Sequence, residues 1–119
     1  MTVLKGVAEK YIDGFRRGDV TEIMSCLSDD VVWALHGDKT LMGKDAFATE
    51  AAAGGGVHAE LTIDRLIEKG DTGVAMGHGS VPLGDSAPTD FAFCEVFTFT
   101  GAVVSRLDTF HIWLGEVQA

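Results

Sequence analysis

A single glutamate lies within a run of phenylalanines at residues 91–99, which read FAFCEVFTF. If this run is a β-strand, Glu95 points to the same face as Phe93 and Phe97, because strand side chains alternate with a period of two. An ionised carboxylate among aromatic rings is costly, so such a group is usually paired, protonated or kept close to water. A protonated acid can donate a proton, which makes Glu95 a candidate for acid–base chemistry.

A second polar group lies in the segment SRLDTF, which also has the character of a strand. Arg106, Asp108 and Phe110 share one face of that strand, and His78 could join them from a neighbouring strand. If this is the face that Glu95 also uses, two carboxylates and a guanidinium meet. Two close carboxylates raise the pKa of one of them, while Arg106 would lower it, and this can give one acid and one base. We therefore expect Asp108 or His78 to act as the base.

Each of these assignments has a purely structural alternative. Arg106 and Asp108 could form an ion pair with each other or with Glu95, since structural ion pairs also perturb carboxylates. Tyr11, on an apolar helix face, could be a core residue whose hydroxyl bonds to the backbone. His78 stands between two glycines and could be a solvated strand residue, while the glycines could mark a bulge or allow another group to approach closely.

The segments that must position these residues are helical first and extended later. Apolar residues recur at steps of three and four up to Phe15 and predict a helix that ends before Gly18. Asp19 and Glu22 resemble a capping box at the start of a second helix, which we expect to include Leu27. A third helix is expected at 44–53, and the predicted strands are 29–35, 57–71, 72–83, 91–99 and 102–115. This order predicts one α+β domain over residues 1–119, with a curved antiparallel sheet wrapped over helices.

Composition excludes several classes of function. The formal net charge of −9 argues against binding to nucleic acid or to an anionic membrane, because both require clustered Lys and Arg. No stretch has the length of a membrane span and the first residues lack the apolar core of a signal peptide, so we expect a cytoplasmic protein. The histidines and cysteines lack metal-site spacing, so no metal is expected.

The other face of the Phe-rich strand, which carries Ala92, Cys94 and Val96, is also nearly apolar. Both faces of the sheet would then be covered. A second copy of the chain is a plausible cover, so we expect a homodimer that forms through the sheet. His111 is expected at the surface or at an interface.

Four segments carry a resemblance that extends over nearly the whole chain: YIDGFRRGD, LSDDVVW, GKDAF and FTFTGAVVSRLDTF. In these segments the chain resembles the nuclear transport factor two-like superfamily, and within it the SnoaL-like and ketosteroid isomerase-like proteins. The resemblance implies a cystatin-like cone, in which three N-terminal helices pack in a strongly curved antiparallel sheet around a pocket. It also implies a small apolar ligand and frequent homodimers. We expect the chemistry to need no cofactor and no metal.

Compared position by position, the resemblance is incomplete. Tyr11 matches the isomerase tyrosine that donates to the substrate oxygen, and Glu95 falls at the acid beside it. Leu35 stands where the isomerase has its general base. Asp108 matches a water-activating aspartate of limonene epoxide hydrolase, but His78 begins the segment where that enzyme has its Arg-x-Asp pair.

We therefore predict proton-transfer chemistry, such as isomerisation, cyclisation or hydrolysis, on a polyketide-like, terpenoid or steroid-like molecule. The alternative is a non-catalytic ligand-binding or dimeric scaffold protein, which the missing isomerase base favours. The predicted catalytic residues are Tyr11, Glu95, Asp108 and His78. The predicted substrate-binding residues are Trp33, Leu35, Phe93, Phe97, Arg106, Phe110 and Trp113.

Overall fold

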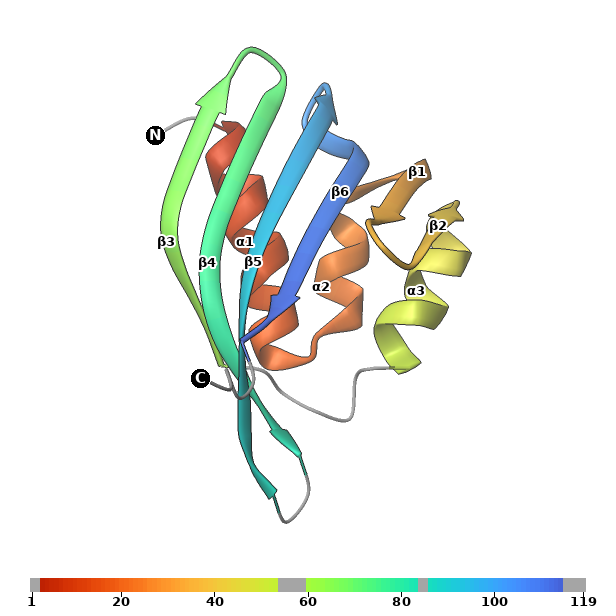
Figure 1. Ribbon diagram of the computed structural model, residues 1–119. Coiled ribbons are helices and arrows are strands. Elements are labelled where there is room, and N and C mark those ends of the chain that lie inside the picture. Colours follow the sequence, from red (N-terminus) through yellow and green to blue (C-terminus); the bar gives the residue numbers. More distant parts are fainter. Residues whose placement is uncertain (1–2, 54–59, 84–85, 115–119) are drawn as a thin grey trace.

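The computed structural model describes residues 3–53, 60–83 and 86–114 and confirms the predicted α+β fold. Three helices lie against one face of a six-stranded sheet (Figure 1). Within the described residues, none of the helices has the length and hydropathy to cross a membrane. The elements are α1 (Val3–Arg17), α2 (Val20–Ser25), β1 (Leu27–Leu35), β2 (Lys39–Met42), α3 (Lys44–Ala53), β3 (Glu60–Lys69), β4 (Thr72–Leu83), β5 (Ser86–Thr100) and β6 (Val103–Trp113).

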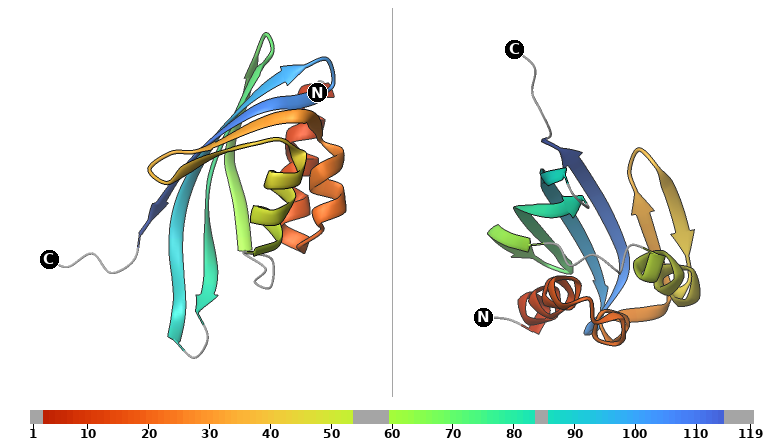
Figure 2. Two further views of the ribbon diagram at one scale, coloured as in Figure 1. Left: turned by 90° about the vertical axis from the view of Figure 1, so that its right-hand side faces the viewer. Right: turned by 90° about the horizontal axis from the view of Figure 1, so that it is seen from below.

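The strand order is β2-β1-β6-β5-β4-β3, and the sheet curves around the helices (Figure 2). Neighbouring strands run antiparallel except β1 and β6, which are parallel, so the sheet is mixed and not wholly antiparallel as expected. The short strand β2 was not predicted. It pairs with β1 after a turn in which Gly37 has a φ of 87°, a backbone conformation that favours glycine.

The first two helices follow from local sequence signals. Tyr11 and Ile12 are each 1% exposed and form part of the apolar face of α1 against the sheet. Gly18, with a φ of 66°, ends the helix as predicted. The Asp19 side chain then accepts a hydrogen bond of 3.0 Å from the backbone N–H of Glu22, which confirms the predicted helix start. The expectation that Leu27 belongs to α2 is wrong, because β1 begins there.

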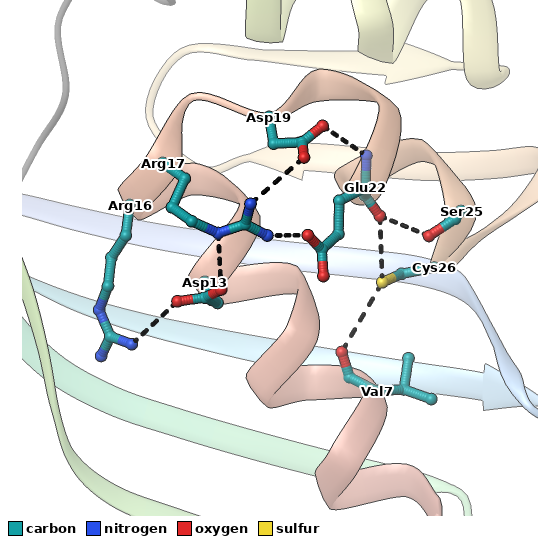
Figure 3. A network of polar contacts seen from close by, with 8 residues as sticks. All are labelled: Val7, Asp13, Arg16, Arg17, Asp19, Glu22, Ser25 and Cys26. Carbon is teal, nitrogen blue, oxygen red and sulfur yellow. Dashed lines mark hydrogen bonds and ion pairs between the residues drawn. The ribbon is translucent and has the colours of Figure 1, made fainter.

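A polar network joins α1 to α2 (Figure 3). Arg17 contacts Asp13 at 2.8 Å and also pairs with Glu22. On the sheet side, the Arg16 Nε donates a hydrogen bond of 2.9 Å to the backbone oxygen of Leu61 in β3. Exposed ion pairs contribute little individually, but this set spans both helices and the edge strand. It therefore links α1 to α2 and to β3 at the surface of the protein.

The glycines of β4 make room for the phenylalanine rings of β5. A Cβ added at Gly77 would lie 2.8 Å from the Phe93 ring and 2.0 Å from the backbone oxygen of Thr62. At Gly79 it would lie 2.6 Å from the Phe91 ring. The structure shows both features that were left open for these glycines: the close approach, and an irregularity of the β3–β4 pairing between Ile63 and Arg65, opposite Gly77.

An irregularity in the β5–β6 pairing sets the direction of every later side chain on β6. Close to the turn, Phe99 pairs with Val104, whereas the next pair is Thr98 with Arg106. Ser105 is therefore an extra residue on β6, which is the definition of a β-bulge. Because side chains alternate with a period of two, a one-residue shift exchanges the two faces of the strand beyond it.

Candidate functional site

Glu95 occupies the inner face of β5, as the alternation predicted, and remains partly accessible. Its direct partner on β6 is Thr109, whose hydroxyl donates a hydrogen bond of 2.9 Å to Glu95 Oε2. The same Thr109 oxygen accepts a hydrogen bond of 2.8 Å from the indole Nε1 of Trp33 on β1. Three strands thus supply one chain of hydrogen bonds that ends at the carboxyl group.

Burial raises the pKa of Glu95 from 4.5 to about 7, and the hydrogen bond from Thr109 acts in the opposite direction. Removing a carboxylate from water disfavours its charged form, and the single donor offsets only part of that cost. Glu95 therefore changes between acid and carboxylate close to neutral pH. A group with this property can give and recover a proton under physiological conditions.

Tyr11 on α1 brings a second polar group close to Glu95. Its ring is 1% exposed and packs edge-on against Phe97 at a centroid distance of 5.3 Å. Burial, and then the charge of Glu95, raise the pKa of Tyr11 well above its ordinary value, so the phenol stays protonated. Within the described residues its hydroxyl has no hydrogen-bond partner, so the backbone partner considered above is not found. A buried donor without a partner is costly, and Tyr11 does not line either of the two pockets described below.

A pocket of about 320 Å³ opens at the end of β1 and β6. Thr109 lines this pocket, and its hydroxyl links the pocket to Glu95. Two residues predicted to bind substrate, Leu35 and Trp113, also lie in its wall. The complete lining consists of Leu35, His36, Gly37, Asp38, Thr109, His111 and Trp113.

The expectation that Asp108 shares the face of Glu95 is wrong. The bulge at Ser105 turns Asp108, together with Arg106 and Phe110, to the outer face of the sheet. There Asp108 accepts hydrogen bonds of 3.0 and 3.1 Å from Arg106 and one of 2.9 Å from His36. The Arg106 guanidinium, followed by His36, holds the pKa of Asp108 below its ordinary value. The structural ion pair considered as an alternative is therefore present, and these residues do not meet Glu95.

His78 also lies on the outer face, as the next residue along β4 from the buried Gly77. Its Nδ1 is 2.8 Å from an Asp64 carboxylate oxygen, and its side chain is 57% exposed. It lines a second pocket, of about 300 Å³, in which Glu95 takes no part. The structure thus does not bring His78 together with Glu95 and Tyr11.

Three further residues predicted to bind substrate, Trp33, Phe93 and Phe97, are buried on the inner face. Trp33 stacks on Phe47 of α3 with a centroid distance of 3.9 Å. These rings cover much of the hydrogen-bond chain with apolar surface, which explains why Glu95 is largely, though not fully, removed from water. Whether they contact a substrate stays a prediction.

Five residues of the pocket lining were not predicted as site residues: His36, Gly37 and Asp38 of the β1–β2 turn, and Thr109 and His111 of β6. Thr109 and His111 are the two that bear on Glu95. Both stand at positions whose orientation depends on the bulge at Ser105, which carries no clear sequence signal. With a regular hairpin Glu95 would pair with Asp108, whereas the observed register gives Thr109. Only the pairing register could have identified them.

Metal-binding side chains do not gather at this site. Over the described ranges of the chain, no group of three or more His, Cys, Asp or Glu residues is placed to hold a metal ion. The polar groups near Glu95 are a phenol, a hydroxyl and an indole N–H. Trp33 and Thr109 already donate their hydrogens within the chain, so among these three groups the Tyr11 hydroxyl is the donor without a partner in the described residues.

Comparisons with known proteins agree with this architecture. A family model described as the SnoaL-like domain matches residues 8–106. No curated protein matches the chain. An NTF2-like protein of unknown function from Burkholderia pseudomallei has 18% identity, with 92% of this chain and 91% of that chain covered and a TM-score of 0.84.

Two other solved structures have a related fold and a described ligand or activity. An LEH-like epoxide hydrolase from M. tuberculosis has 19% identity, with 92% of this chain and 82% of that chain covered and a TM-score of 0.82. A protein with a ketosteroid isomerase-like fold from Catenulispora acidiphila, in complex with trimethylamine, has 10% identity, with 87% and 83% covered and a TM-score of 0.79. At these identities the likeness concerns the fold alone.

Proposed function

The chain belongs to the SnoaL-like domain family, and from this premise we propose that it is a proton-transfer enzyme acting on a small apolar molecule. The ligand would occupy the pocket next to Thr109. Glu95 would serve as the acid, and the reaction would be an isomerisation, cyclisation or hydrolysis of a polyketide-like, terpenoid or steroid-like compound. The pocket volume of about 320 Å³ lies in the range of small-molecule sites.

The observation that carries this proposal is the buried Glu95 with its pKa raised to about 7, joined to the pocket through one hydroxyl. Buried carboxyl groups with such a pKa are frequent among catalytic acids. Tyr11 supports the same role, because its unpartnered hydroxyl lies close enough to Glu95 for the two to interact electrostatically.

Thr109 would transmit the protonation state of Glu95 to the ligand. A hydroxyl has one hydrogen and can accept two hydrogen bonds. When Glu95 is ionised, the Thr109 hydrogen points to the carboxylate. When Glu95 is protonated, its own O–H can donate to Thr109, and the Thr109 hydrogen becomes free to point into the pocket. Trp33 donates to the Thr109 oxygen throughout and holds it in place.

A carbon-acid probe tests this role. The compound 2-tetralone, an apolar ketone labelled with deuterium at its α-carbons, loses the label to water when a proton is transferred. We expect the wild-type exchange rate to fall as the pH rises through about 7, because Glu95 loses its proton there. Glu95→Gln should lower the rate by about 100-fold or more, since a positioned proton donor contributes about 100- to 10,000-fold.

Glu9→Gln is the matched control, because Glu9 is an exposed carboxylate on α1. This variant should exchange the label at the wild-type rate. Equal rates for Glu95→Gln and the wild type across the pH range would contradict the proposed role of Glu95.

The alternative function is a binding protein without catalysis. It is favoured by the closed ion pair of Asp108 with Arg106, which removes one expected base from the pocket. A binder would raise its melting temperature with 2-tetralone, since a ligand of the folded state stabilises it, yet leave the deuterium in place.

A homodimer through the outer face of the sheet is also proposed. Met76, Phe110 and Ile112 are 43%, 41% and 61% exposed, which leaves a large apolar surface open to solvent in a single chain. Phe110→Lys would place a charge on that surface, so a dimer of the wild type should become monomeric in light scattering after chromatography. A wild type that is monomeric at the same concentration would contradict this proposal.

A cytoplasmic location stays a prediction.

A further inference from the structure

We propose that His111 is the catalytic base of this pocket and takes the proton from the carbon of the bound molecule. This inference rests on the proposed function, because it places a base opposite the Glu95 acid. It assigns the role to a residue that neither the sequence patterns nor the resemblance indicated. Leu35, Asp108 and His78 do not supply a base in this pocket, and His111 would take that role.

The position of His111 follows from the register of β6. Glu95 pairs with Thr109, and His111 stands two residues further on the same inner face, opposite Phe93. Diagonal neighbours of this kind on adjacent antiparallel strands lie roughly 7–8 Å apart. A small ring system fits between groups at that separation. Thr109 and His111 both line the pocket, so one ligand can contact the donor and the base together.

Two aromatic rings pack against the imidazole of His111. The His111 ring lies 4.4 Å from the Phe91 ring and 4.6 Å from the Trp113 ring, measured between centroids. Neither neighbour can form a strong hydrogen bond to an imidazole nitrogen across its ring face. Within the described part of the chain, no ion pair or hydrogen bond involves the His111 side chain, so its nitrogens remain available to a ligand.

The electrostatic surroundings also suit a base. His111 is an exposed residue, as expected from the sequence, but partial burial of its ring lowers its pKa. A lowered pKa favours the neutral imidazole, which is the form that can accept a proton. The titratable groups that share its site are Glu95 on β5 and the pocket residues His36 and Asp38 from the β1–β2 turn. His36 is engaged with Asp108 on the outer face, at 2.9 Å.

The proposed step balances without any co-reactant. A nitrogen of neutral His111 takes the proton from the carbon next to a carbonyl, and the C–H electron pair forms a carbon–carbon double bond. The carbonyl π electrons move to the oxygen, which receives the Thr109 hydrogen bond and the proton that Glu95 supplies through it. The products are an enol, an imidazolium and an ionised Glu95. Return of a proton to carbon, at the same or a conjugated position, restores the enzyme.

The test uses the same α-deuterated 2-tetralone, with the full-length protein. The wild-type exchange rate should rise with pH as His111 loses its proton, at a pH below 6.5, and fall again near 7 as Glu95 ionises. His111→Gln should lower the rate by about 100-fold or more and abolish the rise at low pH. In His111→Ala, added imidazole should restore exchange, because it can enter the space between Phe91 and Trp113.

His78→Gln is the matched control, because it removes an exposed histidine from the outer face and should leave the rate unchanged. A rise at low pH that persists in His111→Gln, or a His111→Ala variant that imidazole does not accelerate, would overturn the assignment. A wild-type rate no higher than that of an equal concentration of free imidazole would do the same. The two proposals can also fail separately. If His111→Gln loses the rise at low pH but Glu95→Gln exchanges the label at the wild-type rate, His111 is the base and Glu95 is not the acid.

Discussion

The charge on Glu95 should cost the folded protein stability as the pH rises from about 4.5 through about 7. Its pKa is about 7 in the folded state and 4.5 as an ordinary glutamate, so the folded state binds this proton more tightly than the unfolded state. The free energy of unfolding therefore falls as the pH rises from about 4.5 to about 7. At ~1.4 kcal/mol for each tenfold change in affinity, the full loss is about 3 kcal/mol.

Glu95→Gln removes this loss, because glutamine stays neutral. We expect the unfolding free energy of the variant, relative to the wild type, to increase by about 3 kcal/mol between pH 4.5 and pH 8.5. Urea unfolding of both proteins, at both pH values and at one protein concentration, measures this change in unfolding free energy. Other titrating groups cancel in the comparison, and Glu9→Gln controls for the loss of one carboxylate. A relative change below about 1 kcal/mol would refute the inferred burial of Glu95.

Two further predictions concern the supports of the site. Thr109→Val keeps the shape but removes the donor, so the pKa of Glu95, followed by carboxyl NMR, should rise above its wild-type value, with about 1–3 kcal/mol lost in stability. An unchanged Glu95 pKa would mean that the hydroxyl does not act on the carboxylate. Gly77→Ala should destabilise by about 3 kcal/mol or more in urea unfolding, because the new Cβ meets Phe93 and the backbone. Gly73→Ala, where the nearest ring atom is 3.4 Å away, should cost much less, and equal costs would contradict the close packing.

Local signals account for much of the fold. The apolar spacing around Tyr11 and Ile12 predicts α1, and the Asp19–Glu22 cap predicts where α2 begins, because both depend on contacts within a few residues. The alternation around Glu95 correctly predicts its inner-face position for the same reason. The resemblance to the SnoaL-like proteins gave the family, which the match over residues 8–106 confirms.

The parallel pairing of β1 with β6 could not be predicted in this way. It joins residues far apart in the chain, such as Trp33 and Leu107, and no local pattern distinguishes a parallel neighbour from an antiparallel one. The short strand β2 was missed because four residues give too little alternation to recognise.

The sequence by itself determined that an acidic group would be turned into an aromatic interior, since alternation along one strand is a local property. Tertiary structure alone decided which groups meet it. A single extra residue, Ser105, exchanges the faces of β6, and thereby gives Glu95 the hydroxyl of Thr109 and the imidazole of His111 in place of Asp108. Strand pairing is a contact between distant segments, and a shift of one residue in it reverses the direction of every side chain beyond.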